Sequence, residues 1–375
     1  MNQSSPEPIS AAASPQSLPP VRAMPASMQT SAPPGANRPI VVYAVGTFQR
    51  WMGRLGWVGF LGCLLIILVQ WASLAQYFDT TGGIYESFHS GSTASAEKVA
   101  IIDISGVIVD GDGFVKRQIE RIEADEAVRA IVLRVNSPGG TVTGSDYIHH
   151  YLTKLREKKP QIPLVVSMGS LAASGGYYVA MAVGHQEKVI FAEPTCTTGS
   201  IGVIIPHYDV SKLMERFDVR DDSISSHPRK QMLSMTRPLS NEERQLVQSY
   251  VDESYERFLE IVRGGRKAFA ENPEALKTLA TGEIFSAVQA KKHGLVDEIG
   301  FLDDAIERVC EMANLDAKQV RVVRFRRPEP LLAIPGLAQA PESRSELAAL
   351  LELSTPRAYY LATSLPTLIT SRRAD

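Results

Sequence analysis

Cysteine is scarce in this chain, whose 375 residues contain only Cys63, Cys196 and Cys310. No two of them form a Cys-x-x-Cys pair, so the sequence predicts neither a zinc site nor a disulfide framework. Cys196 and Cys310 could in principle pair with each other, but buried free thiols are the expectation. We therefore predict no metal site.

The chain also lacks an excess of charge of either sign. Its 39 Lys and Arg residues nearly balance 41 Asp and Glu residues, which gives a formal net charge of −2 and a pI of about 6.4. This balance indicates no nucleic-acid partner, because such partners usually demand a basic surface. The chain shows no internal repeat that would double a domain, although it is long enough for a large core.

The N-terminal part has few large apolar residues before a long apolar run begins. Residues 1–38 are rich in Pro, Ser and Ala, and with the basic residues that follow they form a predicted disordered tail and basic flank over 1–54. Residues 55–77 are predicted to be a transmembrane anchor, because about twenty apolar residues match the thickness of a bilayer core. Aromatic residues lie near both ends of this run, as interfacial residues do.

A cleaved signal peptide is the alternative to a retained anchor, since Ser73-Leu74-Ala75 resembles a cleavage site. The segment before it is much longer than the usual charged lead, so we expect the anchor to be retained. Arg50 and Arg54 precede the apolar run and Asp79 follows it. The positive-inside rule then predicts a single-pass protein of the plasma (inner) membrane, with a cytoplasmic N-terminus and an extracytoplasmic domain.

Residues 98–327 are predicted to be the catalytic domain, after a polar linker over 78–97 and before a C-terminal extension over 328–375. In the domain, apolar runs that are typical of buried strands alternate with amphipathic helical patterns. This alternation predicts an α/β fold with a largely parallel sheet. Ligands of such sheets bind beyond the carboxyl ends of strands, where two turns rich in small residues are expected. The extension contains short apolar islands and is predicted to lie in or near a substrate groove.

The first of these turns carries Ser174. An apolar run over 164–166 predicts a strand, small residues follow, and an apolar helical pattern begins after Gly176. A serine at the start of a helix can act as a nucleophile, because free backbone N–H groups there stabilise negative charge. The alternative is a close-packed helix of small residues with a buried hydroxyl group.

A serine nucleophile needs a base to accept its proton, and the residues alone leave that base open. In a histidine triad, the base would be one of the seven histidines of the chain, and His207 and His227 are possible. A lysine would have to lose its proton, which burial favours. The lysines that follow Ser174 and come into question are Lys188, Lys212, Lys230, Lys267 and Lys277.

The second turn is formed by Gly139 and Gly140. Glycine lets backbone N–H groups approach a substrate oxygen closely, so this turn could supply an oxyanion hole beside a nucleophilic serine. An ordinary Pro-Gly turn after a strand is the alternative.

Several ordered motifs together resemble the SppA-type signal peptide peptidases, the protease IV family. They are Asn136-Ser-Pro-Gly-Gly140, the Ala-Ala-Ser-Gly-Gly-Tyr-Tyr stretch within 168–180, Thr198-Gly-Ser-Ile-Gly-Val203, and Gly294-Leu-Val-Asp-Glu-Ile-Gly300. The resemblance covers roughly residues 99–312.

The resemblance implies a ClpP/crotonase-like fold of repeated ββα units and a Ser-Lys dyad without a cofactor. The family's nucleophile corresponds to Ser174, and its base to Lys230 in Ser226-His-Pro-Arg-Lys230, just before Arg237-Pro-Leu-Ser. Gly140 corresponds to the oxyanion glycine, with Gly139 beside it and Gly175 as a second donor.

The resemblance further implies a ring- or dome-shaped oligomer, an octamer in single-domain members, in which neighbouring subunits supply the serine and the lysine. The implied partners are peptide substrates, namely signal peptide remnants and other short apolar peptides. The expected function is therefore a membrane-anchored serine endopeptidase. A catalytically silent oligomeric membrane scaffold and a crotonase-like acyl-CoA enzyme are the alternatives.

Overall fold

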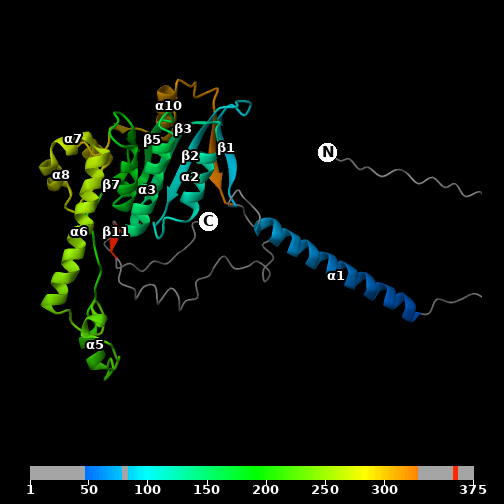
Figure 1. Cartoon of the computed structure of the whole chain (residues 1–375), viewed down its shortest axis with the longest axis horizontal. Coiled ribbons are helices and arrows are strands. Elements are labelled where there is room, and N and C mark those ends of the chain that lie inside the picture. The colour runs from blue at the N-terminus through cyan, green and yellow to red at the C-terminus, as the bar shows by residue number, and fades with distance from the viewer. Residues whose placement is uncertain (1–46, 78–82, 328–357, 362–375) are drawn as a thin grey trace, which may run out of the picture. The chain divides into compact units, whose positions relative to one another are not determined.

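The computed structural model describes residues 47–77, 83–327 and 358–361, and Figure 1 shows these segments. Residues 1–46 of the predicted tail and basic flank, and most of the C-terminal extension, lie outside the described residues. By its internal contacts the chain divides into two units, Met1–Trp71 and Ala72–Asp375, which are described separately.

The first unit contains most of helix α1 (Thr47–Tyr77), which has 31 residues. The helix begins within the predicted basic flank, eight residues before the predicted anchor over 55–77. Trp57, Ile66 and Trp71 are among its exposed apolar side chains. Among the described residues, α1 is the helix whose length and composition would allow it to cross a bilayer, over Arg54–Trp71. This is the segment that the sequence predicts as an anchor.

A sheet of nine strands forms the centre of the second unit. Its strands follow the order β1-β10-β2-β3-β5-β6-β9, and β7 pairs with both β5 and β8. The pairings of β1 with β10 and of β7 with β8 are antiparallel, and the others are parallel. The strands are β1 (Tyr85–Gly91), β2 (Lys98–Ser105), β3 (Val128–Ser137), β5 (Leu164–Ala173), β6 (Ile190–Ala192), β7 (Thr197–Gly199), β8 (Ile284–Ser286), β9 (Glu298–Ile299) and β10 (Arg321–Arg326).

The middle strands of this sheet are buried on both faces. Ile101, Ile102, Val132, Leu133 and Val166 have no exposed surface. Continuous apolar runs of this kind are typical of parallel strands that are covered by helices on each side. The predicted α/β class with a largely parallel sheet is confirmed.

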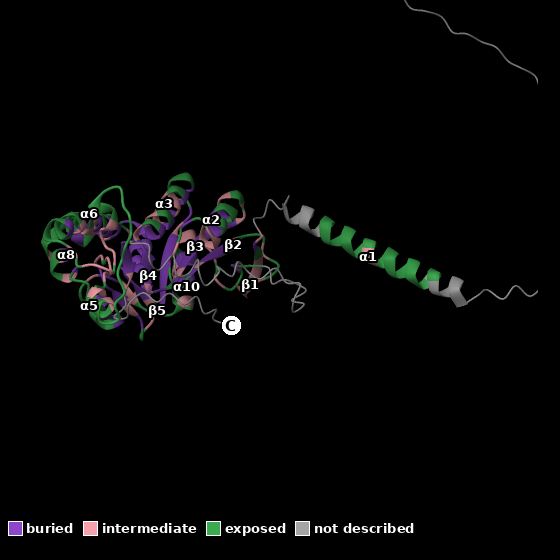
Figure 2. Cartoon of the chain, turned by 90° about the horizontal axis from the view of Figure 1, so that it is seen from below, coloured by how far each residue is buried: buried purple, intermediate pink, exposed green. Residues whose placement is uncertain are grey.

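Helices cover the two faces of the sheet, as Figure 2 shows. The chain runs from β2 through α2 to β3 and through α3 to β5, then returns from β9 through α10 to β10. Because such crossovers are right-handed, the outward and return connections lie on opposite faces. The helices are α2 (Phe114–Ala124), α3 (Val142–Lys158), α4 (Gly175–Ala180), α5 (Ser211–Arg216), α6 (Asn241–Gly265), α7 (Lys267–Glu271), α8 (Pro273–Leu279), α9 (Ala287–Lys292) and α10 (Leu302–Ala313).

The segment predicted as a polar linker over 78–97 contains strand β1. Ile84 is 5% exposed, and β1 pairs along its length with β10. Its sequence is too polar to indicate a strand, because only one face of an edge strand packs on the core. The sheet therefore begins earlier in the chain than Lys98.

The motif Gly294-Leu-Val-Asp-Glu-Ile-Gly300 has a structural role through Asp297. Its carboxylate accepts hydrogen bonds from the N–H groups of Val189 and Ile190, at 3.0 and 2.9 Å. The same carboxylate pairs with the guanidinium of Arg266 at 2.7 Å, and both side chains are largely buried. This arrangement joins the end of α6 to the start of β6 in the sheet.

Candidate active site

Ser174 lies in a tight turn between β5 and α4, as its motif predicts. Its backbone adopts φ 54° and ψ −117°, a conformation that costs a non-glycine residue about 1–3 kcal/mol. Hydrogen bonds hold the turn: the Ser174 N–H donates to the Gly199 carbonyl at 2.7 Å, and the Tyr178 N–H donates to the Ser174 carbonyl at 2.9 Å. Ser174 is 1% exposed. The fold therefore maintains a strained serine at the carboxyl end of a central strand.

The Gly139–Gly140 turn packs directly against this serine turn. A Cβ on Gly175 would lie 3.1 Å from the Gly140 nitrogen, and a Cβ on Gly140 would lie 1.8 Å from the Ile108 carbonyl oxygen. Neither position has room for a side chain, so the backbones of the two turns meet closely. This contact brings together the two turns that the sequence predicts as one site.

Gly139 takes a different role from its neighbours. Its φ is 96°, which favours glycine, and its N–H donates to the Ser137 hydroxyl at 3.1 Å. This N–H therefore has a partner within the turn. The oxyanion role of Gly139, Gly140 and Gly175 stays a prediction.

A strand from the C-terminal extension runs through the candidate site. Strand β11 (Tyr359–Leu361) lies antiparallel to β4 (Gly139–Thr141), and Tyr360 is opposite Gly140. On the other side of β11, Tyr359 and Ile204 exchange two backbone hydrogen bonds of 2.9 and 3.0 Å. The extension therefore fills a slot with backbone partners on both sides, which is the way that extended peptides add to sheet edges.

The register of β11 directs one carbonyl group toward the serine turn and the Gly139–Gly140 turn. The Val142 N–H donates to the Ala358 carbonyl at 3.2 Å, and hydrogen-bonded pairs alternate along an antiparallel ladder, so Tyr360 and Gly140 form the next such pair. A Cβ on Gly139 would lie 2.0 Å from the Tyr360 carbonyl oxygen and 2.5 Å from the Gly175 nitrogen. The Tyr360 carbonyl oxygen thus lies beside the amide that follows Ser174.

The Tyr360 side chain fills an aromatic pocket and has no exposed surface. Its ring centroid lies 4.6 Å from that of Phe258 and 5.0 Å from that of Tyr178. Its hydroxyl donates to the Ser254 carbonyl at 2.7 Å. One wall of the pocket comes from the serine helix α4 and the other from α6, so the pocket depends on how these helices pack.

Charged groups behind the pocket fix the Tyr178 ring. The Tyr178 hydroxyl donates to the Asp146 carboxylate at 2.5 Å, and Arg257 donates to the same oxygen at 3.1 Å. Burial, with the adjacent Asp146, raises the pKa of Tyr178, so the hydroxyl stays a donor at physiological pH. The ring of His149 lies 5.6 Å from that of Tyr178, and burial lowers the pKa of His149 to about 4.

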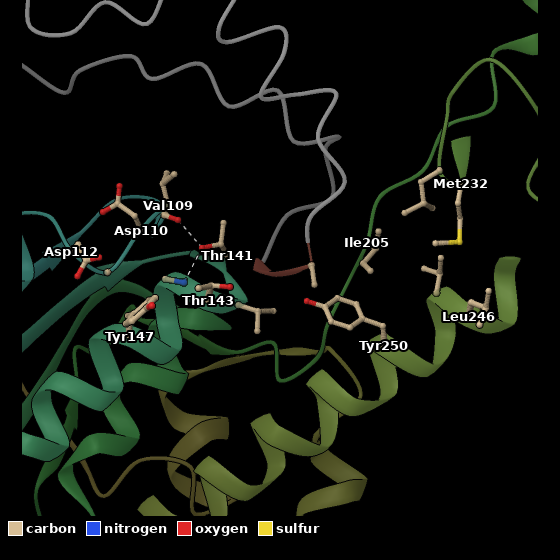
Figure 3. Close-up of a pocket in the computed structure, with 16 residues that line it drawn as sticks. Val109, Asp110, Asp112, Thr141, Thr143, Tyr147, Ile205, Met232, Leu246 and Tyr250 are labelled. Atoms are coloured by element: carbon tan, nitrogen blue, oxygen red, sulfur yellow. Dashed lines mark hydrogen bonds between the residues drawn. The ribbon is translucent and has the colours of Figure 1, made fainter. Parts of the chain in front are cut away.

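A groove of about 580 Å³ continues from the slot on the side of Ala358. Figure 3 shows Thr141, Thr143 and Tyr147 on one side of it and Ile205, Met232, Leu246 and Tyr250 on the other. The second wall is apolar and belongs to α6 and to the segment before it. The groove can therefore accept the apolar side chains of an extended peptide that lies along β4.

Lys230 lies in a projecting segment, residues 206–239, here called the arm. The arm extends past the end of α6 and away from the sheet (Figure 1). Lys230 occupies a short 3₁₀ turn, Pro228–Gln231, and is exposed, whereas Ser174 is buried. Within the described residues of one chain, no hydrogen bond joins these two side chains. One copy therefore brings together the serine and the glycines, but not the lysine.

The arm has little core of its own. None of its residues is buried, and a salt bridge between Arg237 and Glu243, at 2.6 Å, anchors its base to the start of α6. The pKa of Glu243 is about 2, because the Arg237 guanidinium and the Ser240 N–H both bind its carboxylate. Large apolar side chains are exposed on the arm: Tyr208, Leu213, Phe217, Val219, Ile224 and Met235.

The described residues contain no cluster of three or more His, Cys, Asp or Glu that could hold a metal ion. Cys196 and Cys310 are buried free thiols, as expected. His207 contacts the Ser234 carbonyl at 3.1 Å and belongs to the arm. It forms no hydrogen bond to Ser174 within the described residues.

The aromatic pocket is the part of the site that the sequence analysis misses. Ser254, Phe258 and Tyr178 belong to helices predicted only as amphipathic or apolar, and Tyr360 lies in an apolar island of the extension. The sequence signal that could have indicated this part of the site is the apolar island Tyr359–Leu365, in a segment otherwise rich in Pro, Ser and Ala. Its partner strand could not be identified, because the pairing is between segments far apart in the sequence.

Comparison with known proteins gives a consistent result. Residues 156–316 match the model of peptidase family S49. The chain is 35% identical over 240 residues to "Putative protease slr0021" of Synechocystis sp., which covers 64% of this chain and 83% of that protein. It is 37% identical over 234 residues to "Putative signal peptide peptidase SppA" of Enterococcus faecium, which covers 59% of this chain and 65% of that protein.

A third relative is longer. Protease 4 of Salmonella typhi is 36% identical over 225 residues, which make up 58% of this chain but 35% of that protein. The S49 fold is ClpP-like, in agreement with the parallel sheet and with the strand–serine–helix turn. The chain therefore belongs to peptidase family S49, the SppA-type peptidases, and is a serine peptidase.

Proposed function

We propose that this protein is a membrane-anchored endopeptidase in which Ser174 is the nucleophile and Lys230 of a neighbouring subunit is the general base. The observation that carries the proposal is strand β11, which runs antiparallel to β4 with the Tyr360 carbonyl oxygen beside the Gly175 amide. An extended substrate held in this way would present its carbonyl carbon to the residue that precedes Gly175, which is Ser174.

The reaction then proceeds in two halves. Lys230 accepts the Ser174 proton as the oxygen bonds to the substrate carbonyl carbon, and the N–H groups of Gly140 and Gly175 stabilise the oxyanion. The amine product leaves with the proton from Lys230, and an ester of Ser174 remains. A water molecule gives its proton to Lys230 and attacks the ester, and Ser174 regains its proton as the acid product leaves.

The exposed arm supports a shared site. A lysine that is exposed in one copy, on an arm without buried residues, can reach a buried serine if the arm packs against another copy. The interface would be head-to-tail, because the arm of one subunit meets the serine turn of the next. Such interfaces generate closed rings, and an octamer is the size that the resemblance implies.

The groove and helix α1 support the substrate class. One wall of the groove is apolar, and β4 and Ile204 offer backbone partners, so short, extended peptides with apolar side chains fit it. Signal peptide remnants are peptides of this kind. With α1 as an anchor in the plasma (inner) membrane and the domain on the extracytoplasmic side, the site would lie near such peptides.

The test is peptide hydrolysis by the full-length chain in detergent, with Ser174→Ala, Lys230→Ala and the control Lys212→Ala, which changes another exposed lysine of the arm. We expect both dyad variants to lose turnover although their oligomers stay intact. The control variant should stay active. An active Lys230→Ala variant would overturn the base assignment. An oligomer that cleaves no apolar peptide would instead favour the silent scaffold.

A further inference from the structure

We propose that Asn136 is a positioning residue for Ser174, which it holds at a fixed separation from the Gly140 amide. The inference deepens the proposed function and rests on it. Asn136 acts through a hydrogen bond between the two strands that lead into the serine turn and the Gly139–Gly140 turn.

The pairing of β3 with β5 is interrupted at Asn136. Before the interruption, Val135 is opposite Met168. After it, Ser137 is opposite Ala172. One residue of β3 therefore stands against three residues of β5, which form a β-bulge. A bulge leaves backbone groups without ladder partners and bends the strand, so it changes the direction of the residues that follow.

This bulge lies just before the serine, at the point where β5 changes its partner. On the side away from β3, β5 pairs with β6 up to Met168 and with β7 from Leu171. The last residue paired with β7 is Ala173, and Ser174 follows it directly. The direction of this short final piece of β5 therefore decides where the serine lies.

The Asn136 side chain closes the bulge. Its carboxamide oxygen accepts hydrogen bonds from the Leu171 N–H at 3.2 Å and from the Ser170 hydroxyl at 2.9 Å. The first bond takes the place of a ladder partner that the shifted register removes. Leu171 is three residues before Ser174, and Asn136 is four residues before Gly140. One hydrogen bond thus joins the two segments that end in the proposed nucleophile and in a proposed oxyanion donor.

Arg134 supports the start of the same bulge. Its guanidinium donates to the Ser167 hydroxyl at 2.8 Å and to the Glu193 carboxylate at 2.5 Å. It also lies against Gly169, where a Cβ would be 3.0 Å from the Arg134 Nη2 atom. Arg134 therefore holds the start of the bulge, and Asn136 holds the end that leads to the serine.

Asn136 can be replaced without disturbing the core. Asn136 and Ser170 are exposed, whereas Ser137 and Ala172, which follow the bulge, are buried. Replacing an exposed side chain leaves no cavity, so the variants should fold. Losing the hydrogen bond should instead let the bulge relax. A misplacement of reacting groups by about 1 Å can lower the rate about 100-fold.

The test compares the full-length chain with Asn136→Leu, Asn136→Asp and the control Ser170→Ala, by cleavage of a fluorogenic Ala-Tyr-Tyr-Leu peptide. Leucine has no acceptor, so kcat of Asn136→Leu should fall about 100-fold while KM changes less than about threefold. Aspartate keeps an oxygen that can accept the Leu171 N–H, so Asn136→Asp should recover kcat to within about fivefold of the original chain. Ser170→Ala keeps the Leu171 bond and should have a small effect.

A second measurement reports on the serine without peptide turnover. A small fluorophosphonate probe reacts when the Ser174 oxygen bonds to phosphorus and fluoride leaves. The rate of this labelling should fall in Asn136→Leu and recover in Asn136→Asp, in parallel with kcat. A general loss of stability would lower the amount of active protein in both variants and would not follow the acceptor.

The outcomes separate the two proposals. A kcat and a labelling rate of Asn136→Leu equal to those of the original chain would refute the positioning role, while the peptidase proposal stands. Equal losses in Asn136→Leu and Asn136→Asp, or a change in KM alone, would refute it as well. Labelling that depends on the acceptor at residue 136, in an oligomer that cleaves no peptide, would support the positioning role and contradict the proposed function.

Discussion

Replacing Tyr360 with alanine is expected to activate the enzyme toward added peptides. Strand β11 occupies the slot that the proposed substrate needs, so the extension and a substrate compete for β4. The fully buried Tyr360 ring provides much of the docking energy. Truncating a buried aromatic side chain costs about 3–5 kcal/mol, and a loss of about 3 kcal/mol weakens docking roughly 150-fold.

This change should appear in KM and not in kcat. When β11 is docked, only the undocked fraction of sites binds peptide, so the apparent affinity falls by that fraction. The Tyr360→Ala variant should therefore reach half-maximal rate at much lower peptide concentration, with a gain of up to about 150-fold if docking is tight. The chemical step is unaffected, because Tyr360 is not part of the catalytic machinery.

The assay is steady-state cleavage of a fluorogenic Ala-Tyr-Tyr-Leu peptide by the full-length chain. Leu361→Ala is the control, since Leu361 lies on the same strand, is partly exposed and is outside the aromatic pocket. We expect a small effect from the control and a large fall in KM from Tyr360→Ala. An unchanged or raised KM in Tyr360→Ala would refute the competition.

Three other changes test separate parts of the structure. Gly140→Ala should lower kcat at least about 100-fold, because its Cβ would lie 1.8 Å from the Ile108 oxygen and displace an oxyanion donor; wild-type kinetics would contradict this. Asp297→Ala should lower the free energy of unfolding by about 3–5 kcal/mol in denaturant titrations, since Arg266 would be left buried without its partner; a loss below 1 kcal/mol would contradict it. Between pH 6.5 and about 4 the unfolded chain protonates His149 and the folded chain does not, so the free energy of unfolding should decrease by up to about 3 kcal/mol as the pH is lowered through this range. In His149→Gln this decrease should be less steep. Identical slopes for the two proteins would contradict this reasoning.

The sequence predicts the fold class and the two turns of the candidate site because these depend on local patterns. A β-branched run followed by small residues predicts Ser174 at a strand end, and the Pro-Gly-Gly turn marks Gly140. Edge strand β1 is missed because its residues are polar, and only its pairing with β10 identifies it. The hydrogen bond from the Gly139 N–H to the Ser137 hydroxyl depends on the conformation of the turn, which the sequence could not reveal.

The role of the extension was anticipated only in outline. Its apolar islands predict a place in or near a substrate groove, and the structure shows β11 beside β4. The register that sets Tyr360 opposite Gly140 arises from pairing between segments far apart in the chain. The position of Lys230 on an arm is equally nonlocal, because it depends on how the arm leaves α6.

Mixing two inactive variants tests the central claim that Ser174 and Lys230 act together from different copies. Full-length Ser174→Ala and Lys230→Ala chains are each purified, dissociated, combined in equal amounts and reassembled. If the site is shared head-to-tail, about a quarter of the sites in a random ring regain both groups, and turnover returns to about that fraction of wild type. If both groups must come from one chain, the mixed oligomer stays inactive, and that result would contradict the account.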